Sequence, residues 1–143
     1  MGYKVDTLLT IGSITMSDTT EYRVSLVKDM RNRVRVSLQV WWRKDNEEEW
    51  VPGKGFNLTR DMTTRIVKCL RNAMDCESSE SIIPLSDTQR YHVSKLIDKD
   101  LVVISKWWHK GDHNWTEGKS LALPTENIPK LASMLEVASK KVA

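Results

Sequence analysis

The sequence lacks the features that define several large classes of protein. No stretch approaches the roughly 18 consecutive apolar residues of a membrane-spanning helix. The N-terminus lacks the basic flank, apolar run and small-residue cleavage site of a secretory signal peptide. Only two cysteines occur, Cys69 and Cys76, and their spacing fits neither a paired zinc knuckle nor a redox CxxC motif. We therefore expect an intracellular protein in a reducing compartment, without a membrane partner; the sequence does not distinguish nucleus from cytoplasm.

Motifs of catalysis and cofactor binding are also sparse. The segment "EGKS" at 117–120 lacks the glycine that a phosphate-binding loop needs five residues before Gly118, where His113 stands. His109 and His113 could share a metal, but "HKGDH" in a predicted loop is more typical of a solvated turn. No Ser, His and Asp arrangement or carboxylate pair stands out, although catalytic groups need not be contiguous. We expect no enzyme activity, no metal and no cofactor.

Charge is small overall but unevenly distributed. The formal net charge is +3, which by itself does not imply a polyanionic partner. Between Arg23 and Lys44, however, Asp29 is the single acid. The acids gather instead at 47–49 and around 77–87, and such polarity favours an oriented anionic partner. The basic residues of the positive segment are Arg23, Lys28, Arg31, Arg33, Arg35, Arg43 and Lys44.

The tryptophans indicate an internal repeat, because all six fall into two matched sets. One set lies in "VWWRKDNEEEWVPGKGFNL" and the other in "KWWHKGDHNWTEGKSLAL". One deleted residue aligns them, after which Gly53 matches Gly118 and Lys54 matches Lys119 at an offset of 65. Upstream, "YRVSLVKDMRNRVRVSL" matches "YHVSKLIDKDLVVIS" with about three residues fewer in the second copy. The sets are Trp41, Trp42 and Trp50, and Trp107, Trp108 and Trp115.

Each copy predicts strands followed by one helix. In the first copy, alternation predicts a strand with Val34, Val36, Leu38 and Val40 on one face and Arg33, Arg35, Ser37 and Gln39 on the other. A charged hairpin loop, "RKDNEEEWVPGKG", and a short strand "FNL" follow, and "HKGDHNWTEGK" is the matching loop. Residues 8–16 are expected to add a first strand.

Apolar spacing predicts the two helices. Thr59 or Asn57 can cap the first helix, whose apolar stripe is Met62, Ile66, Leu70 and Ala73. The second is expected from 125 to about 140, with Thr125 as its cap and Pro129 in its first turn. Its stripe is Ile128, Leu131, Leu135 and Ala138.

The first copy resembles the transcriptional coactivator family called positive cofactor four, in the Whirly-like superfamily. The resemblance is carried by "VKDMRNRVRV", by a strand ending in Trp42, and by "PGKGFNL" at the family's distance from that tryptophan. It covers about residues 23–73, with a weaker echo over 91–137. It implies a curved four-stranded antiparallel sheet followed by a helix, with sequence-tolerant binding of single strands or melted duplex along the exposed sheet.

The resemblance also implies contact residues for nucleic acid. In the first copy the family's contact positions hold Arg23, Arg31, Arg33, Trp42 and Lys54, and Arg35 shares the basic segment. Met30 replaces the usual aromatic residue and Gln39 the usual arginine. The second copy keeps Trp108 and Lys119, and Lys99 falls near a basic position, but most of the arginines are missing. We expect the first copy to bind more strongly.

In each tryptophan doublet we expect one core residue and one exposed residue. Strict alternation would place Trp42 on the face of Val40 and Leu38, in the core, whereas the resemblance exposes it and a bulge could re-aim it. We favour Trp42 and Trp108 as stacking residues, Trp41 and Trp107 as inward residues, and Trp50 and Trp115 as packing or loop anchors. For the arginines, the alternative is a solvated strand face.

The predicted fold class is α+β, with two tandem repeats of a curved antiparallel four-stranded sheet followed by one helix. The first repeat spans 1–75, a linker rich in Ser, Asp and Glu spans 76–90, and the second repeat spans 91–143. We expect the repeats to pack as a pseudo-twofold dimer within a monomeric chain, or the chain to form a higher homo-oligomer.

The expected function is sequence-tolerant binding of single-stranded DNA in replication, recombination, repair or transcription. Basic residues hold phosphates, and aromatic faces accept any base, so a basic and aromatic sheet suits a single strand. One alternative is a transcriptional adaptor or protein-interaction module whose tryptophans contact protein. Another is an RNA-binding protein, because stacking and phosphate contacts read neither sugar decisively.

Overall fold

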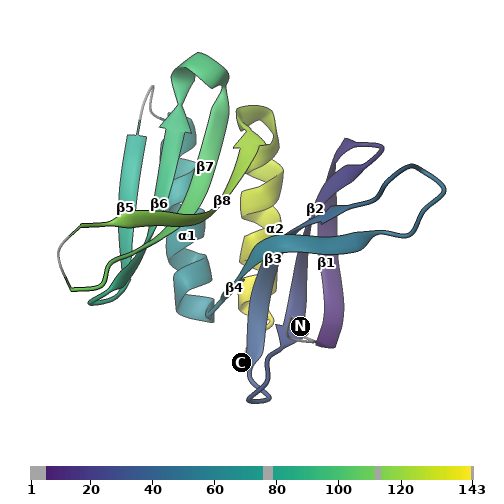
Figure 1. The fold of residues 1–143 in the computed structure, drawn as a ribbon, viewed down its shortest axis with the longest axis horizontal. Helices are drawn as coiled ribbons and strands as arrows, with labels where there is room; N and C mark the ends of the chain where they lie inside the picture. Colours follow the sequence, from purple (N-terminus) through teal and green to yellow (C-terminus); the bar gives the residue numbers. More distant parts are fainter. Residues whose placement is uncertain (1–5, 76–78, 112–113, 143) are drawn as a thin grey trace. The chain divides into compact units, whose positions relative to one another are not determined.

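A computed structural model describes residues 6–75, 79–111 and 114–142 (Figure 1). No helix in these ranges is long and apolar enough to cross a membrane. The first half of the chain contains β1 (Asp6–Ser17), β2 (Thr20–Lys28), β3 (Val34–Trp42), β4 (Val51–Leu58) and α1 (Arg60–Asp75). The second half contains β5 (Ser79–Ser86), β6 (Gln89–Leu96), η1 (Ile97–Lys99), β7 (Leu101–Trp108), β8 (Thr116–Pro124), η2 (Thr125–Asn127) and α2 (Ile128–Lys140).

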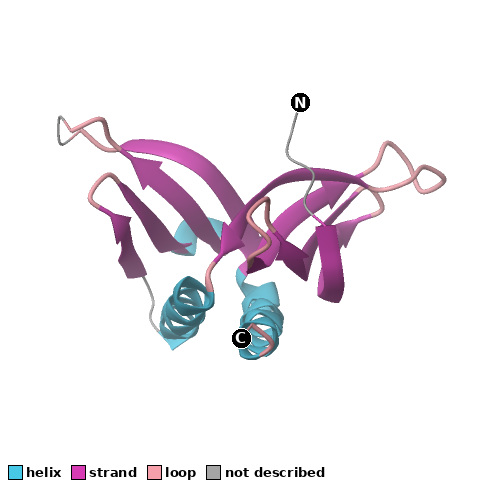
Figure 2. Ribbon diagram, turned by 90° about the horizontal axis from the view of Figure 1, so that it is seen from below, coloured by secondary structure: helices cyan, strands magenta, loops and turns pink. Residues whose placement is uncertain are grey.

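The strands form two four-stranded antiparallel sheets, one in the order β1-β2-β3-β4 and one in the order β5-β6-β7-β8. Each sheet is followed in the chain by a helix. This confirms the α+β class and the predicted repeat of strands and then a helix. The strands bend and twist along their length (Figure 2).

Alternation decides which face of each sheet is buried. In the first sheet Val24 pairs with Leu38, and Leu38 pairs with Phe56, and all three are buried. Successive side chains on a strand point to opposite faces, so the neighbouring pair of Arg23 and Gln39 lies on the other face. In the second sheet Val93 and Ile104 form the pair that corresponds to Val24 and Leu38. We use "polar face" below for the face of Arg23 and Gln39, and for its counterpart in the second sheet.

The helices keep the predicted stripes, and every residue of both stripes is buried. The Thr59 hydroxyl caps α1 by accepting the Met62 N–H at 3.1 Å. The prediction that Thr125 caps the second helix is wrong. Its hydroxyl donates to the Asp100 carboxylate, its N–H donates to the Asp100 carbonyl, and a short 3₁₀ turn precedes α2, which begins at Ile128.

Two segments predicted to be irregular are strands. Residues 79–86, within the predicted linker 76–90, form β5, which pairs with β6 and buries Ile83. The second sheet therefore begins before residue 91. The strand β4 begins at Val51, five residues before the predicted strand "FNL". The strand β5 is rich in serine, and β4 contains proline and two glycines. These residues obscure the alternation of apolar and polar residues that would predict a strand.

By their internal contacts, the residues form two compact units. One comprises Met1–Thr64 with Ser133–Ala143, and the other comprises Arg65–Ala132. The first unit thus combines the first sheet with the C-terminal part of α2, where the Met134 sulfur lies beside Gly12 of β1. The second unit combines the second sheet with most of α1 and the beginning of α2.

Candidate nucleic-acid interface

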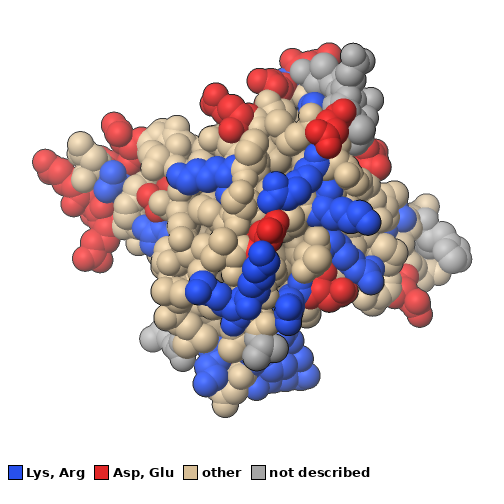
Figure 3. Space-filling view, turned by 180° about the vertical axis from the view of Figure 1, so that it is seen from behind, with Lys and Arg blue, Asp and Glu red and all other residues tan. Residues whose placement is uncertain are grey.

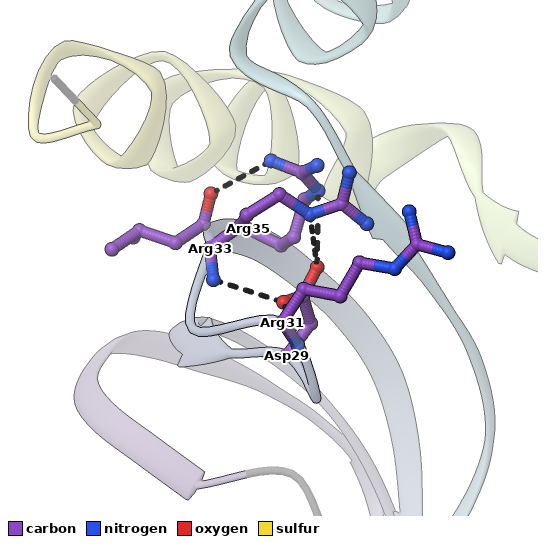
Figure 4. A network of polar contacts seen from close by, with 5 residues as sticks. Asp29, Arg31, Arg33 and Arg35 are labelled. Atoms are coloured by element: carbon purple, nitrogen blue, oxygen red, sulfur yellow. Dashed lines mark hydrogen bonds and ion pairs between the residues drawn. The ribbon is translucent and has the colours of Figure 1, made fainter.

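The hairpin between β2 and β3 is organised by the single acid of the basic segment (Figure 4). The Asp29 carboxylate accepts the backbone N–H groups of Arg31 and Arg33, both at 2.9 Å. It also accepts Arg33 Nε at 3.0 Å and lies 3.8 Å from Arg35 Nε. Asn32 adopts φ 61°, a left-handed conformation that asparagine tolerates in turns. Asp29 therefore fixes the turn that presents the arginines.

These bonds stabilise the charged form of Asp29. Its pKa lies below the usual value, chiefly because the Arg33 backbone N–H binds the carboxylate, with further contributions from Arg31 and the Arg33 side chain. The carboxylate consequently stays ionised at neutral pH and keeps its acceptors available to the turn.

The hairpin presents charge and one apolar side chain to solvent. Arg31 is exposed, and the Arg33 side chain is 52% exposed. Met30 is 72% exposed. Arg35 is more restricted, because its Nη1 donates to the Val34 carbonyl at 3.3 Å. Figure 4 shows the Arg31 and Arg33 side chains extending to the same side of the turn, whereas the Arg35 guanidinium points toward the Val34 carbonyl.

A β-bulge occurs at the same place in both sheets. In the first sheet Gly53 and Lys54 of β4 oppose the single residue Val40 of β3. In the second sheet Gly118 and Lys119 of β8 oppose Lys106 of β7. A bulge places two residues against one and locally re-aims the strand. The matched "GK" pairs of the sequence are therefore the two bulges, and both lysines are exposed.

The second tryptophan of each doublet lies over the glycine of the bulge. A Cβ atom on Gly53 would lie 3.3 Å from Trp42 Cδ1, and one on Gly118 would lie 3.5 Å from Trp108 Cδ1. Glycine thus lets each indole approach the neighbouring strand closely. Trp42 is 50% exposed and Trp108 is 38% exposed.

The exposure of Trp42 and Trp108 agrees with the prediction, but its cause differs from the one considered. The register between β2 and β3 is unbroken through Trp42, so Trp42 does share the face of Leu38. Burial decreases along that face toward the strand end, from fully buried Leu38 through half-buried Val40 to Trp42. The bulge is in the neighbouring strand and does not turn the tryptophan over.

Trp108 has a basic neighbour, Lys110, that the comparison of the two copies did not indicate. Lys110 Nζ lies 5.8 Å from the centre of the Trp108 ring. Lys106 has a lowered pKa, first because it is partly buried and second because the Lys119 charge is near. Lys106 and Lys110 flank the tryptophan doublet in "SKWWHK". This position in the sequence could have identified them as candidate basic residues.

The first tryptophan of each doublet lies on the polar face and not in the core, so the prediction of Trp41 and Trp107 as inward residues is wrong. Trp41 lies beneath Arg23, whose guanidinium carbon is 4.2 Å from the ring centre. Arg23 also pairs with Glu21 at 2.6 Å. Gln39, on the same face, donates to the Gly53 carbonyl at 2.8 Å. Arg23 and Gln39 were predicted to contact nucleic acid. In the structure, both side chains instead contact other residues of the first sheet.

The third tryptophan of each set anchors the loop that follows the doublet. Arg43 lies 4.2 Å from the Trp50 ring centre, and its Nε donates to the Asp18 carbonyl. In the second sheet His109 stands in place of Arg43, contacts the Asp87 carbonyl at 2.8 Å, and meets Trp115 edge-on. These contacts agree with the prediction of Trp50 and Trp115 as loop anchors.

Apart from Arg23 and Gln39, the predicted contact residues of the first sheet fall into two groups. Met30, Arg31, Arg33 and Arg35 lie at the β2–β3 hairpin, whereas Trp42 and Lys54 lie at the other end of β3. At about 3.3 Å per residue, roughly 30 Å of strand separates Arg33 from Trp42. On the second sheet, exposed Lys99 lies in η1 at the corresponding hairpin, away from Trp108 and Lys119.

Acidic side chains form separate groups from most lysines and arginines on the face drawn in Figure 3. The acids Glu47, Glu48 and Glu49 are exposed in the loop between β3 and β4.

Metal ligands were considered only as an alternative. No group of three or more His, Cys, Asp or Glu residues within 6–75, 79–111 and 114–142 is arranged to hold a metal ion. His113 and Cys76 lie outside the described residues, so the proposed pair of His109 and His113 has no described geometry. Cys69 is a free, half-buried thiol.

The fold defines a protein class of two repeats, each a four-stranded antiparallel sheet followed by one helix. Comparison with solved structures finds a chain from the crystal structures of Trypanosoma brucei MRP1/MRP2, with a TM-score of 0.48 and 14% identity. The match covers 95% of this chain and 83% of that chain. No family model matches the sequence, and no curated protein matches it.

Proposed function

We propose that this protein binds single-stranded nucleic acid with little sequence preference, and that single-stranded DNA is its main ligand. Replication, recombination, repair and transcription are the processes in which such an activity would act. The proposal agrees with what the resemblance of the first copy to the positive cofactor four family implies.

The observation that carries the proposal is the repeated combination of an exposed indole, a bulge glycine and an exposed lysine. Trp42 with Lys54, and Trp108 with Lys119, provide this combination once in each sheet. An exposed indole face can stack on any base, and a nearby lysine can hold the phosphate. Both interactions tolerate any sequence. Stacking on the indoles is lost when the bases are paired inside a duplex, so it is the interaction that favours a single strand.

The hairpin provides additional charge on the first sheet. Arg31 and Arg33 are exposed there, on a turn that Asp29 fixes before any ligand binds. A fixed turn reduces the ordering cost of binding. The β6–β7 hairpin presents Lys99 but lacks this arginine group, so we expect the first sheet to contribute more of the affinity.

The first test removes the two exposed indoles. Trp42→Ala with Trp108→Ala should weaken binding of a short oligothymidine at least tenfold, because stacking contributes about 1–3 kcal/mol per base. Binding is measured by fluorescence anisotropy of a labelled strand. Val137→Ala, which shortens an apolar side chain that is 46% exposed on α2, is the control and should leave affinity unchanged. Normal binding by the folded double variant would contradict the proposed surface.

A second test concerns the arginines of the hairpin. Arg31→Ala with Arg33→Ala should lower the salt dependence of binding, with the slope of log K against log salt falling by about 1.4 for two lost phosphate contacts. Arg60→Ala with Lys68→Ala removes the same charge from exposed positions of α1 and should leave the slope unchanged. Equal effects of the two pairs would show that only net charge matters.

We further propose that the two repeats pack as a pseudo-twofold dimer within one chain, as the sequence repeat indicates. Light scattering should then give the mass of a monomer. A stable symmetric dimer in solution would contradict this packing and leave the binding proposal intact.

A further inference from the structure

The polar face of the second sheet contains a hollow of about 460 Å³. Its lining includes Glu80, Arg90, His92, Ser105, Trp107 and Glu117. Pockets of about 300–1,000 Å³ are typical of small-molecule sites, so the hollow is large enough for a nucleobase. None of these residues belongs to the contact set of the proposed function.

The hollow lies where the repeats differ. In the first sheet Arg23 covers Trp41, and Gln39 reaches the Gly53 carbonyl. The registers place His92 at the position of Arg23, and Ser105 at that of Gln39. Both replacements are shorter, so they leave space over the second sheet that longer side chains occupy on the first.

The rim of the hollow is acidic. Glu117 stands at the position of Pro52, and Glu80 at that of Thr10. Both glutamates are exposed. Two carboxylates repel phosphate but accept hydrogen bonds from N–H groups, so a ligand should present donors and no negative charge at this edge.

Arg90 brings a donor to the same hollow. Its guanidinium carbon lies 3.9 Å from the Trp115 ring centre, and its Nε donates to His92 Nε2 at 2.8 Å. Stacking occupies the face of the guanidinium and leaves the donor edge in the plane of the group. His92 is held between Arg90 and Glu80 and stacks on Trp107 with ring centres 4.6 Å apart.

We propose that the hollow binds a guanine ring. Guanine combines adjacent N–H donors, which suit a carboxylate of Glu80 or Glu117, with O6 and N7 acceptors, which are the commonest specific partners of arginine. Adenine lacks the carbonyl acceptor, and thymine lacks the adjacent donors. The inference rests on the proposed function where the guanine belongs to a bound strand, and the second repeat then adds a base preference to otherwise tolerant binding.

The test compares oligothymidine with the same strand carrying one central guanine. The guanine strand should bind about tenfold more tightly, since one good paired contact to a base gives a preference of this order or more. Inosine, which lacks the exocyclic amino group, and 7-deazaguanine, which lacks the N7 acceptor, should each reduce the gain. Equal binding of the guanine and thymine strands would overturn the proposal.

Ser105→Gln restores the longer residue of the first sheet and should abolish the guanine preference while leaving oligothymidine binding unchanged. Ser133→Gln, at an exposed position of α2, is the matched control and should keep the preference. Glu117→Gln changes an exposed side chain without changing its shape and should also reduce the preference. A preference that survives both Ser105→Gln and Glu117→Gln would place the guanine elsewhere and overturn the proposal.

Free guanosine distinguishes the two sources of the ring. Binding of guanosine to the wild type but not to Ser105→Gln, together with no binding of oligothymidine, would support the hollow and contradict the proposed function. Binding of oligothymidine with no gain from guanine in either form would contradict the hollow alone. A gain seen only within a strand would assign the hollow to a base of the bound strand.

Discussion

At the scale of single residues, two glycines show how tightly neighbouring atoms pack in the first sheet. A Cβ atom on Gly55 would lie 2.5 Å from the Leu38 carbonyl oxygen and 2.7 Å from Gln39 Cα, both backbone atoms. A Cβ atom on Gly12 would lie 2.6 Å from the Met134 sulfur, part of a flexible side chain that can move. The same substitution should therefore have different costs at the two sites.

We predict that Gly55→Ala lowers the free energy of unfolding by about 2–3 kcal/mol, because overpacking against fixed atoms costs this much. Gly12→Ala should cost less than about 1 kcal/mol, since rotamer adjustment relieves the contact. Urea denaturation followed by circular dichroism measures both values. Equal losses at the two positions would show that backbone contact does not set the cost at Gly55.

His92 gives a residue-scale prediction about pH. Its pKa lies below the ordinary 6.5, mainly because burial disfavours the cation and also because Arg90 is near, while Glu80 and Glu117 act in the opposite direction. The unfolded chain therefore binds the proton more readily. Stability is complete above pH 6.5 and declines as the pH falls below it toward the lowered pKa of the folded state.

The corresponding measurement is thermal denaturation at pH 7.5 and 5.5. The wild type should lose more stability between these pH values than His92→Asn, which cannot gain the proton. An identical loss in both proteins would assign the pH dependence to other groups.

At the scale of elements, the β2–β3 hairpin makes preorganisation testable. Asp29→Ala removes a negative charge from a basic site, so charge alone predicts tighter binding of a single strand. Loss of the bonds to Arg31 and Arg33 loosens the turn, and we predict binding about two- to tenfold weaker, from the cost of ordering such side chains. Asp29→Asn keeps an acceptor oxygen and should be less impaired. Tighter binding by Asp29→Ala would show that the turn needs no fixing.

Elements also show what the sequence could predict. Alternation around Leu38 and the apolar stripes of both helices identified the buried faces correctly, because burial itself imposes those periods. The strand β5 was missed because it is at a sheet edge, with exposed Ile82, Leu85 and Ser86 in a segment rich in polar residues. The prediction made β4 too short because proline and glycine are typical of a turn. In the structure Gly53 is part of a bulge and Pro52 lies next to it.

The candidate site was predictable only in part. The repeat identified the pairs Trp42 with Lys54 and Trp108 with Lys119, because both copies keep them at matching positions. Local sequence does not show that Arg23 is engaged by Glu21 and Trp41, which are brought together by strand pairing. The hollow beside Ser105 was not predictable either, since it depends on side chains from four paired strands.

At the scale of the whole molecule, the net charge of +3 is modest. The positive and negative side chains matter more through their separate positions than through their sum. Exposed acids lie in the β3–β4 loop, while arginines lie at the β2–β3 hairpin and lysines at the two bulges. Binding should therefore weaken with added salt by about 0.7 in log K per tenfold salt for each phosphate held. If the proposed function holds, stacking on the indoles should be the part of the affinity that salt removes least.

The central claim is tested most directly by titrating the protein with a short oligothymidine and, separately, with a duplex of the same length, while following tryptophan fluorescence at several salt concentrations. We predict strong quenching by the single strand, little by the duplex, and weaker binding as salt increases, because bases stack on Trp42 and Trp108 only when unpaired. No quenching by the single strand at low salt, or equal quenching by the duplex, would contradict the account.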